Sequence, residues 1–293
     1  MSVYQNLMSQ IHDAGLLFNV DSQSLKTAHG IDVPNKRALI NTSNNQVMSV
    51  VSDTYKVVTN AEIYSSFCRS IEASGLDVEG ATVNVKQTKN GSRAMVDFVF
   101  PSHEIRVKGD DSTTALQICA LNSFDGSTRY MTKAGGLRMK CLNGQILGDV
   151  IGAYSSLHTK SLDVEQGADN VLKMIQDFQT ASEKWGAMMK KPVSNEDAFK
   201  YICKFLNVKF EDRVDPQGEP LRESPALQNC KALWATYSRD LGRNAYALYN
   251  VFTDYMTHYR PRSQDPARRL ISVRAKGAKQ MDALGIFNIV PAA

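Results

Sequence analysis

The first half of the chain carries short, mostly apolar stretches separated by turn residues, and in some of them apolar and polar residues alternate, which is the pattern of β-strands. These stretches are residues 47–51, 81–85, 94–100, 105–108 and 116–121. Asn90 and Gly91 lie between the second and third stretches and favour a tight hairpin turn. After the first stretch, Thr59 and Glu62 form the N-cap signal of a helix that Gly75 would end. The pattern predicts an antiparallel sheet with packed helices.

In the second half the apolar residues recur every three or four positions, which indicates helices. Such residues run from Val171 to Trp185, and Ser194 is the polar start of a further helix. Two more helices are expected over residues 226–237 and 244–259. The predicted fold class is α+β, with an antiparallel sheet and packed helices in the N-terminal half and a mostly helical C-terminal half.

Turn residues and changes in composition divide the chain into four predicted regions. Residues 1–37 are expected to form an N-terminal helix and an irregular lead-in, because a polar stretch with Gly30 and Pro34 follows the first apolar residues. An α+β sheet domain over 38–160 and a helical region over 161–260 follow. The last region, 261–293, is a basic tail, typical either of a solvated segment or of a nonspecific nucleic-acid tether. The cations of the tail and of the residues just before it are Arg260, Arg262, Arg268, Arg269, Arg274, Lys276 and Lys279.

Composition narrows the function only modestly. The 293 residues are 43% hydrophobic and 22% charged, with a net charge of +4, which permits nucleic-acid binding without requiring it. Five scattered cysteines without zinc or Cys-x-x-Cys spacing favour reduced thiols in a reducing cytoplasm. The start of the chain lacks the features of a signal peptide, and no apolar run is long enough to span a bilayer. We therefore expect a soluble protein of the cytoplasm with no membrane partner.

Motifs of catalysis are absent from the sequence. It contains no Gly-x-x-x-x-Gly-Lys-Ser/Thr phosphate loop, no Gly-x-Gly-x-x-Gly, no His-Glu-x-x-His and no Gly-x-Ser-x-Gly. We expect no cofactor, no metal and no catalytic residue, and this favours a binding protein. The enzymatic alternative is a metal-dependent nuclease with scattered carboxylate ligands. Its candidates are Asp97, Glu104, Asp110, Asp111 and Asp125, although an aspartate before glycine, as in Asp125-Gly126, most often forms a turn.

Basic residues beside predicted strands suggest a polyanionic partner. Four cations follow the Asp125-Gly126 turn, and the last two lie two residues apart, so a strand would present them on one face. Tyr55 and Lys56 follow the first strand, where the ring could stack on a base or pack against the protein. Each neutralised phosphate would add salt-dependent affinity, although a solvated strand surface has the same composition. The candidate nucleic-acid-binding residues are Tyr55, Lys56, Arg129, Lys133, Arg138 and Lys140.

Four ordered blocks of the sequence resemble a known family. Residues 50–62 are similar to its "VVSDRYKVVQNxE" and residues 122–127 to its "NSHDGS", with Phe124 where histidine is usual. Residues 137–144 resemble "RVVCxNTL", and residues 233–235 with 244–258 resemble "TLWxxxNAVTEYxDH". The family is domain of unknown function 932, also called phage/plasmid-like proteins, and the resemblance covers roughly residues 38–260.

The resemblance implies the handling of single-stranded DNA, through a suspected relation of the family to phage annealing proteins of the Red-beta type. Its first candidates for DNA contact are Tyr55, Lys56, Arg138 and Lys140, and Phe124 argues against a catalytic histidine in the turn. We expect a phage- or plasmid-encoded protein that binds single-stranded DNA and promotes ATP-independent annealing as a homo-oligomeric ring or filament. Besides the nuclease, the alternative is an interaction protein that inhibits a host factor.

Overall fold

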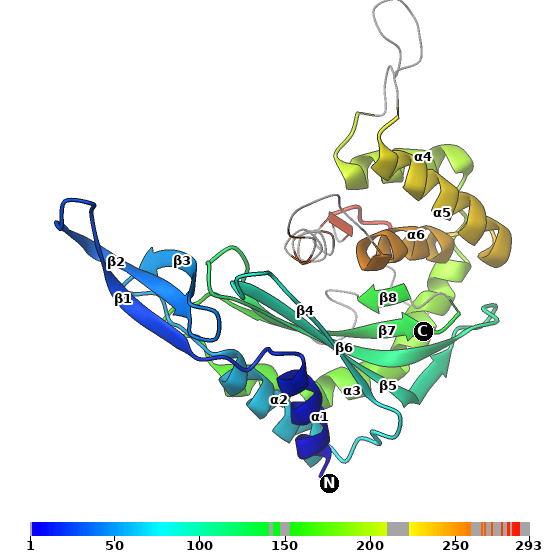
Figure 1. Ribbon diagram of the computed structural model, residues 1–293. Helices are drawn as coiled ribbons and strands as arrows, with labels where there is room; N and C mark the ends of the chain where they lie inside the picture. The colour runs from blue at the N-terminus through cyan, green and yellow to red at the C-terminus, as the bar shows by residue number, and fades with distance from the viewer. Residues whose placement is uncertain are drawn as a thin grey trace, which may run out of the picture.

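The computed structural model describes residues 2–140, 143–146, 153–209 and 223–258, and also residues 265, 267, 271, 277, 280–281 and 283–287. Within these residues the chain forms two antiparallel sheets and six helices (Figure 1). The sheets fill the first half of the chain and helices dominate the second. This arrangement confirms the predicted α+β fold class.

The smaller sheet has the strand order β1-β2-β3 and projects from the body of the molecule (Figure 1). Its strands are β1 (Val20–Lys26), β2 (Asp32–Asn41) and β3 (Gln46–Ser52). The base of this sheet packs on the rest of the protein through a small apolar cluster that includes Leu39 and Phe124. The sheet therefore joins the body next to the turn of residues 122–127.

The larger sheet has the order β4-β5-β6-β7-β8, and β9 pairs with the other end of β7. Its strands are β4 (Thr82–Gln87), β5 (Arg93–Arg106), β6 (Thr113–Ser123), β7 (Tyr130–Arg138), β8 (Asn143–Ile146) and β9 (Ala153–Ser156). The register aligns Asn84, Asp97, Cys119 and Lys133 as one row across four strands. Because directly paired residues share a face, this row defines one side of the sheet.

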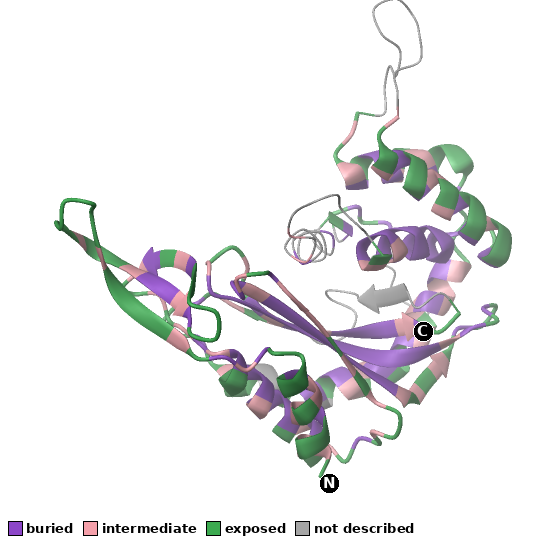
Figure 2. Cartoon of the chain, viewed as in Figure 1, coloured by how far each residue is buried: buried purple, intermediate pink, exposed green. Residues whose placement is uncertain are grey.

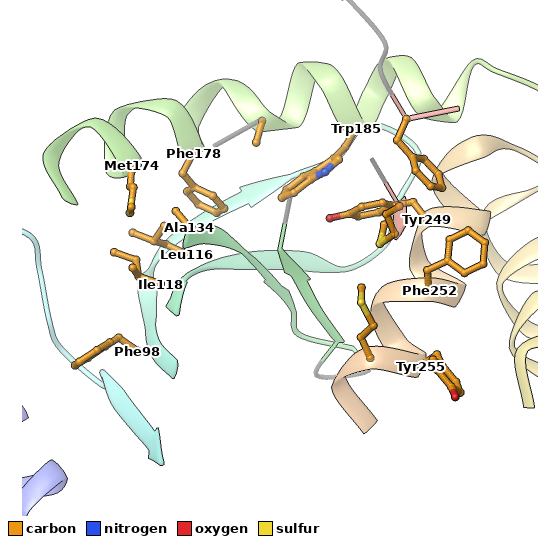
Figure 3. Close-up of a cluster of buried hydrophobic side chains, with 14 of the residues drawn as sticks. Phe98, Leu116, Ile118, Ala134, Met174, Phe178, Trp185, Tyr249, Phe252 and Tyr255 are labelled. Carbon is orange, nitrogen blue, oxygen red and sulfur yellow. The ribbon is translucent and has the colours of Figure 1, made fainter. Parts of the chain in front are cut away.

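The helices divide into two groups. The helices α1 (Val3–Asp13), α2 (Asn60–Ala73) and α3 (Val164–Met189) cover one face of the larger sheet, and Figure 3 shows Phe178 of α3 over Ala134. The helices α4 (Asn195–Leu206), α5 (Pro225–Leu241) and α6 (Ala245–His258) pack together near β8. Figure 2 shows that α6 is buried along its length. No helix in the described part of the chain is long and apolar enough to cross a membrane.

Local sequence signals explain several helix ends. Thr59 caps α2 in a full capping box, in which its hydroxyl accepts the Glu62 N–H and the Glu62 carboxylate accepts the Thr59 N–H. Gly75 follows α2 with a φ of 68°, which is the left-handed conformation common after a helix. The predicted start and end of this helix are confirmed.

The expectation of an irregular lead-in before residue 38 is wrong in part. β1 and the first residues of β2 lie in this stretch, paired from Val20–Asn41 to Lys26–Asp32. β1 is exposed at most positions, so both its faces are polar and it lacks the alternation that marks a half-buried strand. The backbone ladder rather than side-chain burial defines this strand.

The C-terminal region is packed at the positions that the structure describes. Ile271 is buried on the face of the larger sheet opposite the helices, in a cluster with Met95, Cys119 and Leu121. Met281 and several residues after it are buried near α6. At these positions the region 261–293 is part of the core, whereas the cations that led to its description as a basic tail lie outside the described residues.

Candidate nucleic-acid interface

Tyr55 occupies a junction between the two sheets. Its hydroxyl donates to the Ser123 carbonyl at 2.8 Å, and its ring stacks on His158 with centroids 5.0 Å apart and planes at 14°. The guanidinium of Arg37 donates to the Tyr55 carbonyl. Burial raises the pKa of the Tyr55 hydroxyl well above its ordinary value. His158 stacks on the ring, and the half-buried side chain packs against the apolar cluster at the base of the small sheet, so Tyr55 is better explained as a structural contact than as a base-stacking platform.

Two asparagines of the family-like blocks meet beneath this junction. The Asn122 amide donates to the Asn60 side-chain oxygen at 2.9 Å and to the Val58 carbonyl at 3.2 Å. Asn60 in turn donates to the Leu16 carbonyl at 3.2 Å, and both asparagines are fully buried. A buried amide destabilises the fold unless it is hydrogen-bonded. The hydrogen bond between Asn122 and Asn60 therefore joins the segments 122–127 and 50–62 for a structural reason.

The turn of residues 122–127 is formed by Asp125, as the sequence predicts. One carboxylate oxygen of Asp125 accepts the Ser127 N–H at 3.0 Å and the other accepts Nε of Arg93 at 2.8 Å. Gly126 has a φ of 66°, in the left-handed region. Phe124 is 1% exposed and packs in the apolar cluster at the base of the small sheet. The residue that replaces the family's usual histidine is therefore a core residue here.

Arg138 lies in a second buried polar cluster, at the other end of β7. Its guanidinium donates twice to Asp110, from Nε to Oδ2 at 2.7 Å and from Nη2 to Oδ1 at 2.5 Å. The Tyr246 hydroxyl also donates to Asp110 Oδ2, at 3.3 Å. Arg138 is 2% exposed, so we withdraw it as a candidate for DNA contact. Its role is to join β7 to α6 through Asp110.

Lys140 and Lys56 are exposed but already engaged. Lys140 forms an ion pair of 2.7 Å with Asp111, which raises the pKa of the lysine and lowers that of the carboxylate. The ammonium of Lys56 donates to the Leu162 carbonyl at 2.7 Å, just before α3 begins. Lys140 also lies beyond the end of β7, so the expectation that a strand presents it beside Arg138 is wrong.

The remaining two candidates, Arg129 and Lys133, form a distinct surface. Arg129 immediately precedes β7 and is exposed, and Lys133 is half-buried on β7. Met131 and Lys133 alternate on the face of β7 opposite the helices, and Arg129 lies two residues before Met131, just outside the strand. The side chains of Arg129 and Lys133 form no hydrogen bond or ion pair with any other described residue. We call Arg129, Met131 and Lys133 the β7 stripe.

The two groups of candidates are far apart. β7 runs from Tyr130 to Arg138, which at 3.4 Å per residue is about 27 Å. The structure therefore brings together Tyr55, Lys56 and Arg129 at one end, and places Arg138 and Lys140 at the other. Among the six candidate residues, only Arg129 and Lys133 lack a side-chain hydrogen bond or ion pair with the described residues.

The carboxylates of the nuclease alternative are dispersed. Asp97 pairs with Lys86 at 3.6 Å, Asp125 with Arg93, and Asp110 with Arg138. Within the described residues no group of three or more His, Cys, Asp or Glu side chains lies close enough to hold a metal ion. The structure therefore adds no geometric support for this alternative.

A surface hollow of about 430 Å³ lies beside Lys56 and the start of α3. Its walls carry Lys56 and Lys160 but also Glu62, Asp163 and Glu165. The acidic side chains outnumber the basic ones, so this hollow is a poor site for phosphate. The hollow is therefore a weaker candidate for a nucleic-acid interface than the β7 stripe.

Two residues near this end of β7, Leu157 and His158, are not predicted from the sequence as part of the candidate site. β9 contains only four residues and carries no clear alternation, so no strand was predicted there. The pairing of β9 with β7 places Leu157 near Arg129 and turns His158 toward Tyr55. No signal in the sequence indicates these contacts, because they depend on which strand β9 joins.

By its architecture the chain is an α+β protein with a projecting three-stranded sheet and a larger antiparallel sheet that is covered on one face by helices. The model of the family described as Domain of unknown function (DUF932) matches residues 47–283, and the chain therefore belongs to that family. This confirms the family that the four blocks indicate. No curated protein and no solved structure gave a significant match to the chain.

Proposed function

We propose that the protein binds single-stranded DNA through the β7 stripe and promotes ATP-independent annealing of complementary strands. The observation that carries the proposal is a pair of cations whose side chains form no hydrogen bond or ion pair with the described residues: Lys133, on the sheet face opposite the helices, and Arg129, just before β7. Arg138 and Lys140 are held in ion pairs and Lys56 donates to the Leu162 carbonyl, whereas Arg129 and Lys133 have no such side-chain contact with the described residues.

The geometry of the stripe suits a linear polyanion. Arg129 and Lys133 are four residues apart on an extended backbone, which separates their Cα atoms by about 14 Å. An anionic strand lying along β7 could contact both cations in turn. Both side chains are long and flexible, so they can follow a strand without reading its sequence. Sequence-independent contact is what annealing of arbitrary complementary strands requires.

The proposal extends to phage or plasmid recombination or replication, in the cytoplasm of the host cell, with several subunits presenting a longer track. The sequence supports ATP independence because it lacks a phosphate-binding loop. A homo-oligomer would place several β7 stripes along one strand and raise the affinity through multivalency. The role in recombination or replication, the host cytoplasm and the oligomer are proposed from the family resemblance and not from the two cations.

The test is fluorescence anisotropy of a labelled oligonucleotide at several salt concentrations. Each phosphate contact with a single strand contributes about 0.7 to the slope of log K against log salt. The double variant Arg129→Gln/Lys133→Gln should therefore bind more weakly and lower the slope by about 1.4. Lys140→Gln is the matched control, since it removes an exposed lysine at the far end of β7 and should leave the slope unchanged.

An annealing assay with two complementary strands completes the test. The wild-type protein should accelerate annealing without ATP, and the double variant should lose this effect. If the wild-type protein fails to bind at low salt, the proposal is wrong and a host-protein partner becomes the next function to examine. If Lys140→Gln weakens binding as much as the double variant, the β7 stripe is not the interface.

A further inference from the structure

Leu157 is exposed beside the β7 stripe although it is a large apolar residue. It is 53% exposed, and it is one of five large apolar side chains that are exposed in the described part of the chain. Tyr130 pairs with Ser156 and Met131 with Ser155, and Tyr130–Ser156 is the last pair of these two strands. Arg129 and Leu157 are the residues that directly flank this last pair, which places them at the same end of the sheet.

The backbone of Leu157 is held in place from both sides. β9 ends at Ser156, and the next residue, His158, accepts the Lys56 N–H through its carbonyl at 3.0 Å while its ring stacks on Tyr55. The Leu157 carbonyl itself accepts the Thr159 N–H at 2.8 Å. An apolar side chain that stays exposed to water costs free energy, which a ligand that covers it would recover. Because the backbone of Leu157 is already fixed, little conformational entropy is lost when such a ligand binds.

Met131 provides a second apolar group within the stripe. It is half-buried between Arg129 and Lys133 and packs at the edge of the cluster of Met95, Leu121 and Ile271. Cations and apolar groups therefore alternate along this end of β7. A single strand offers phosphates, which cations can contact, next to unpaired bases, whose faces can pack on apolar groups.

We propose that Leu157 and Met131 form an apolar shelf for unpaired bases beside the phosphate contacts of Arg129 and Lys133. This inference rests on the proposed function and defines its substrate class as an unpaired strand. In a duplex the bases are stacked and paired inside the helix, and the phosphates alone face outward. Only a strand with exposed base faces can cover the shelf, and aliphatic contact with a base face is independent of base identity. The shelf accounts for a preference for single strands without sequence specificity.

An oligonucleotide of abasic residues separates this inference from the proposed function, because it keeps the phosphates and lacks the bases. The wild-type protein should bind an ordinary single strand about tenfold more tightly than the abasic strand, which corresponds to a contact of about 1.4 kcal/mol. Leu157→Ser should bind the ordinary strand about tenfold more weakly and leave abasic binding unchanged. Arg129→Gln/Lys133→Gln should weaken binding to both strands.

Val47→Ser is the matched control, since Val47 is 55% exposed on the projecting sheet and lies on β3. It should bind both oligonucleotides as the wild-type protein does. Equal wild-type affinity for the ordinary and the abasic strand would overturn the shelf and leave the proposed function intact. Absence of binding to either strand would overturn the proposed function itself. A Leu157→Ser variant that lost affinity for both strands equally would also contradict the shelf.

Discussion

Arg138 and Asp110 form a bidentate ion pair inside the protein, although 28 residues separate them in the sequence. The side chain of Asp110 is fully buried and that of Arg138 is 3% exposed. Tyr246 of α6 contacts the same carboxylate, so the pair connects the larger sheet to the C-terminal helices. A residue that its charge and position suggest as a DNA contact is instead an internal structural link.

Asp110→Asn is expected to destabilise the protein by about 3–5 kcal/mol. The substitution leaves the Arg138 guanidinium buried without its counter-charge, which is the costly way to break a buried ion pair. The measurement is urea denaturation followed by circular dichroism. Lys140→Gln is the control, because it removes the exposed ion pair with Asp111, keeps both carboxylates near Arg138 and should cost less than about 1 kcal/mol. Similar effects of the two variants would show that Arg138 is not buried as described.

Gly136→Ala is expected to destabilise the protein by about 1–3 kcal/mol through overpacking. A Cβ at Gly136 would overlap Cγ2 of Thr114 and lie 2.8 Å from the Trp185 ring. Figure 3 shows Trp185 held between the sheet and Tyr249, so the indole has little space to move. The melting temperature of the variant should fall.

Gly186→Ala is the control for this substitution. Gly186 lies in α3, and a Cβ there would have no neighbour within 4 Å. Alanine favours a helix over glycine by about 1 kcal/mol, so this variant should melt at the same or a higher temperature. The packing described would be contradicted if Gly186→Ala lowered the melting temperature and Gly136→Ala did not.

The stability of the protein should fall as the pH drops below 6.5 because of His158. Burial lowers the pKa of His158 from its ordinary value of 6.5, and its Nδ1 donates to the Lys56 carbonyl at 3.3 Å. Below pH 6.5 the unfolded state binds a proton that the folded state binds only at lower pH, so the free energy of unfolding decreases through this range. Denaturation curves between pH 5 and pH 8 measure this slope.

His158→Phe provides the comparison for this pH dependence. The phenyl ring can still stack on Tyr55, but it does not titrate and cannot donate to the Lys56 carbonyl. The variant should be less stable at pH 8 and should show a shallower loss of stability below pH 6.5. An unchanged slope would mean that His158 does not cause it.

Tyr55→Phe is expected to cost about 1 kcal/mol of stability. The substitution keeps the ring against His158 and removes the hydrogen bond from the hydroxyl to the Ser123 carbonyl. Thermal unfolding gives the stability change. Because Tyr55 lies outside the β7 stripe, the Tyr55→Phe variant should bind single-stranded DNA with the same affinity as the wild-type protein. A clear loss of DNA affinity would return Tyr55 to the interface.

Local sequence signals identified most of the elements of this fold. The apolar stretch 94–100 and the alternation within residues 116–121 predicted the central strands, and the Thr59–Glu62 signal predicted the start of α2. These predictions succeed because strand alternation, helix periodicity and capping depend on neighbours a few residues away. β1 escaped prediction because its side chains are exposed on both faces, and β9 because it is too short for a pattern.

The sequence by itself determined the α+β class, the family and a set of six candidate residues. Only the tertiary structure decided which of them are available to a ligand. Arg138 is buried in an ion pair with Asp110, and Lys140 forms an exposed ion pair with Asp111. The side chains of Arg129 and Lys133 form no ion pair or hydrogen bond with the described residues. The physical reason is that the partner of a charge is set by strand pairing and helix packing between distant segments. Charge and spacing along the chain carry no record of that pairing.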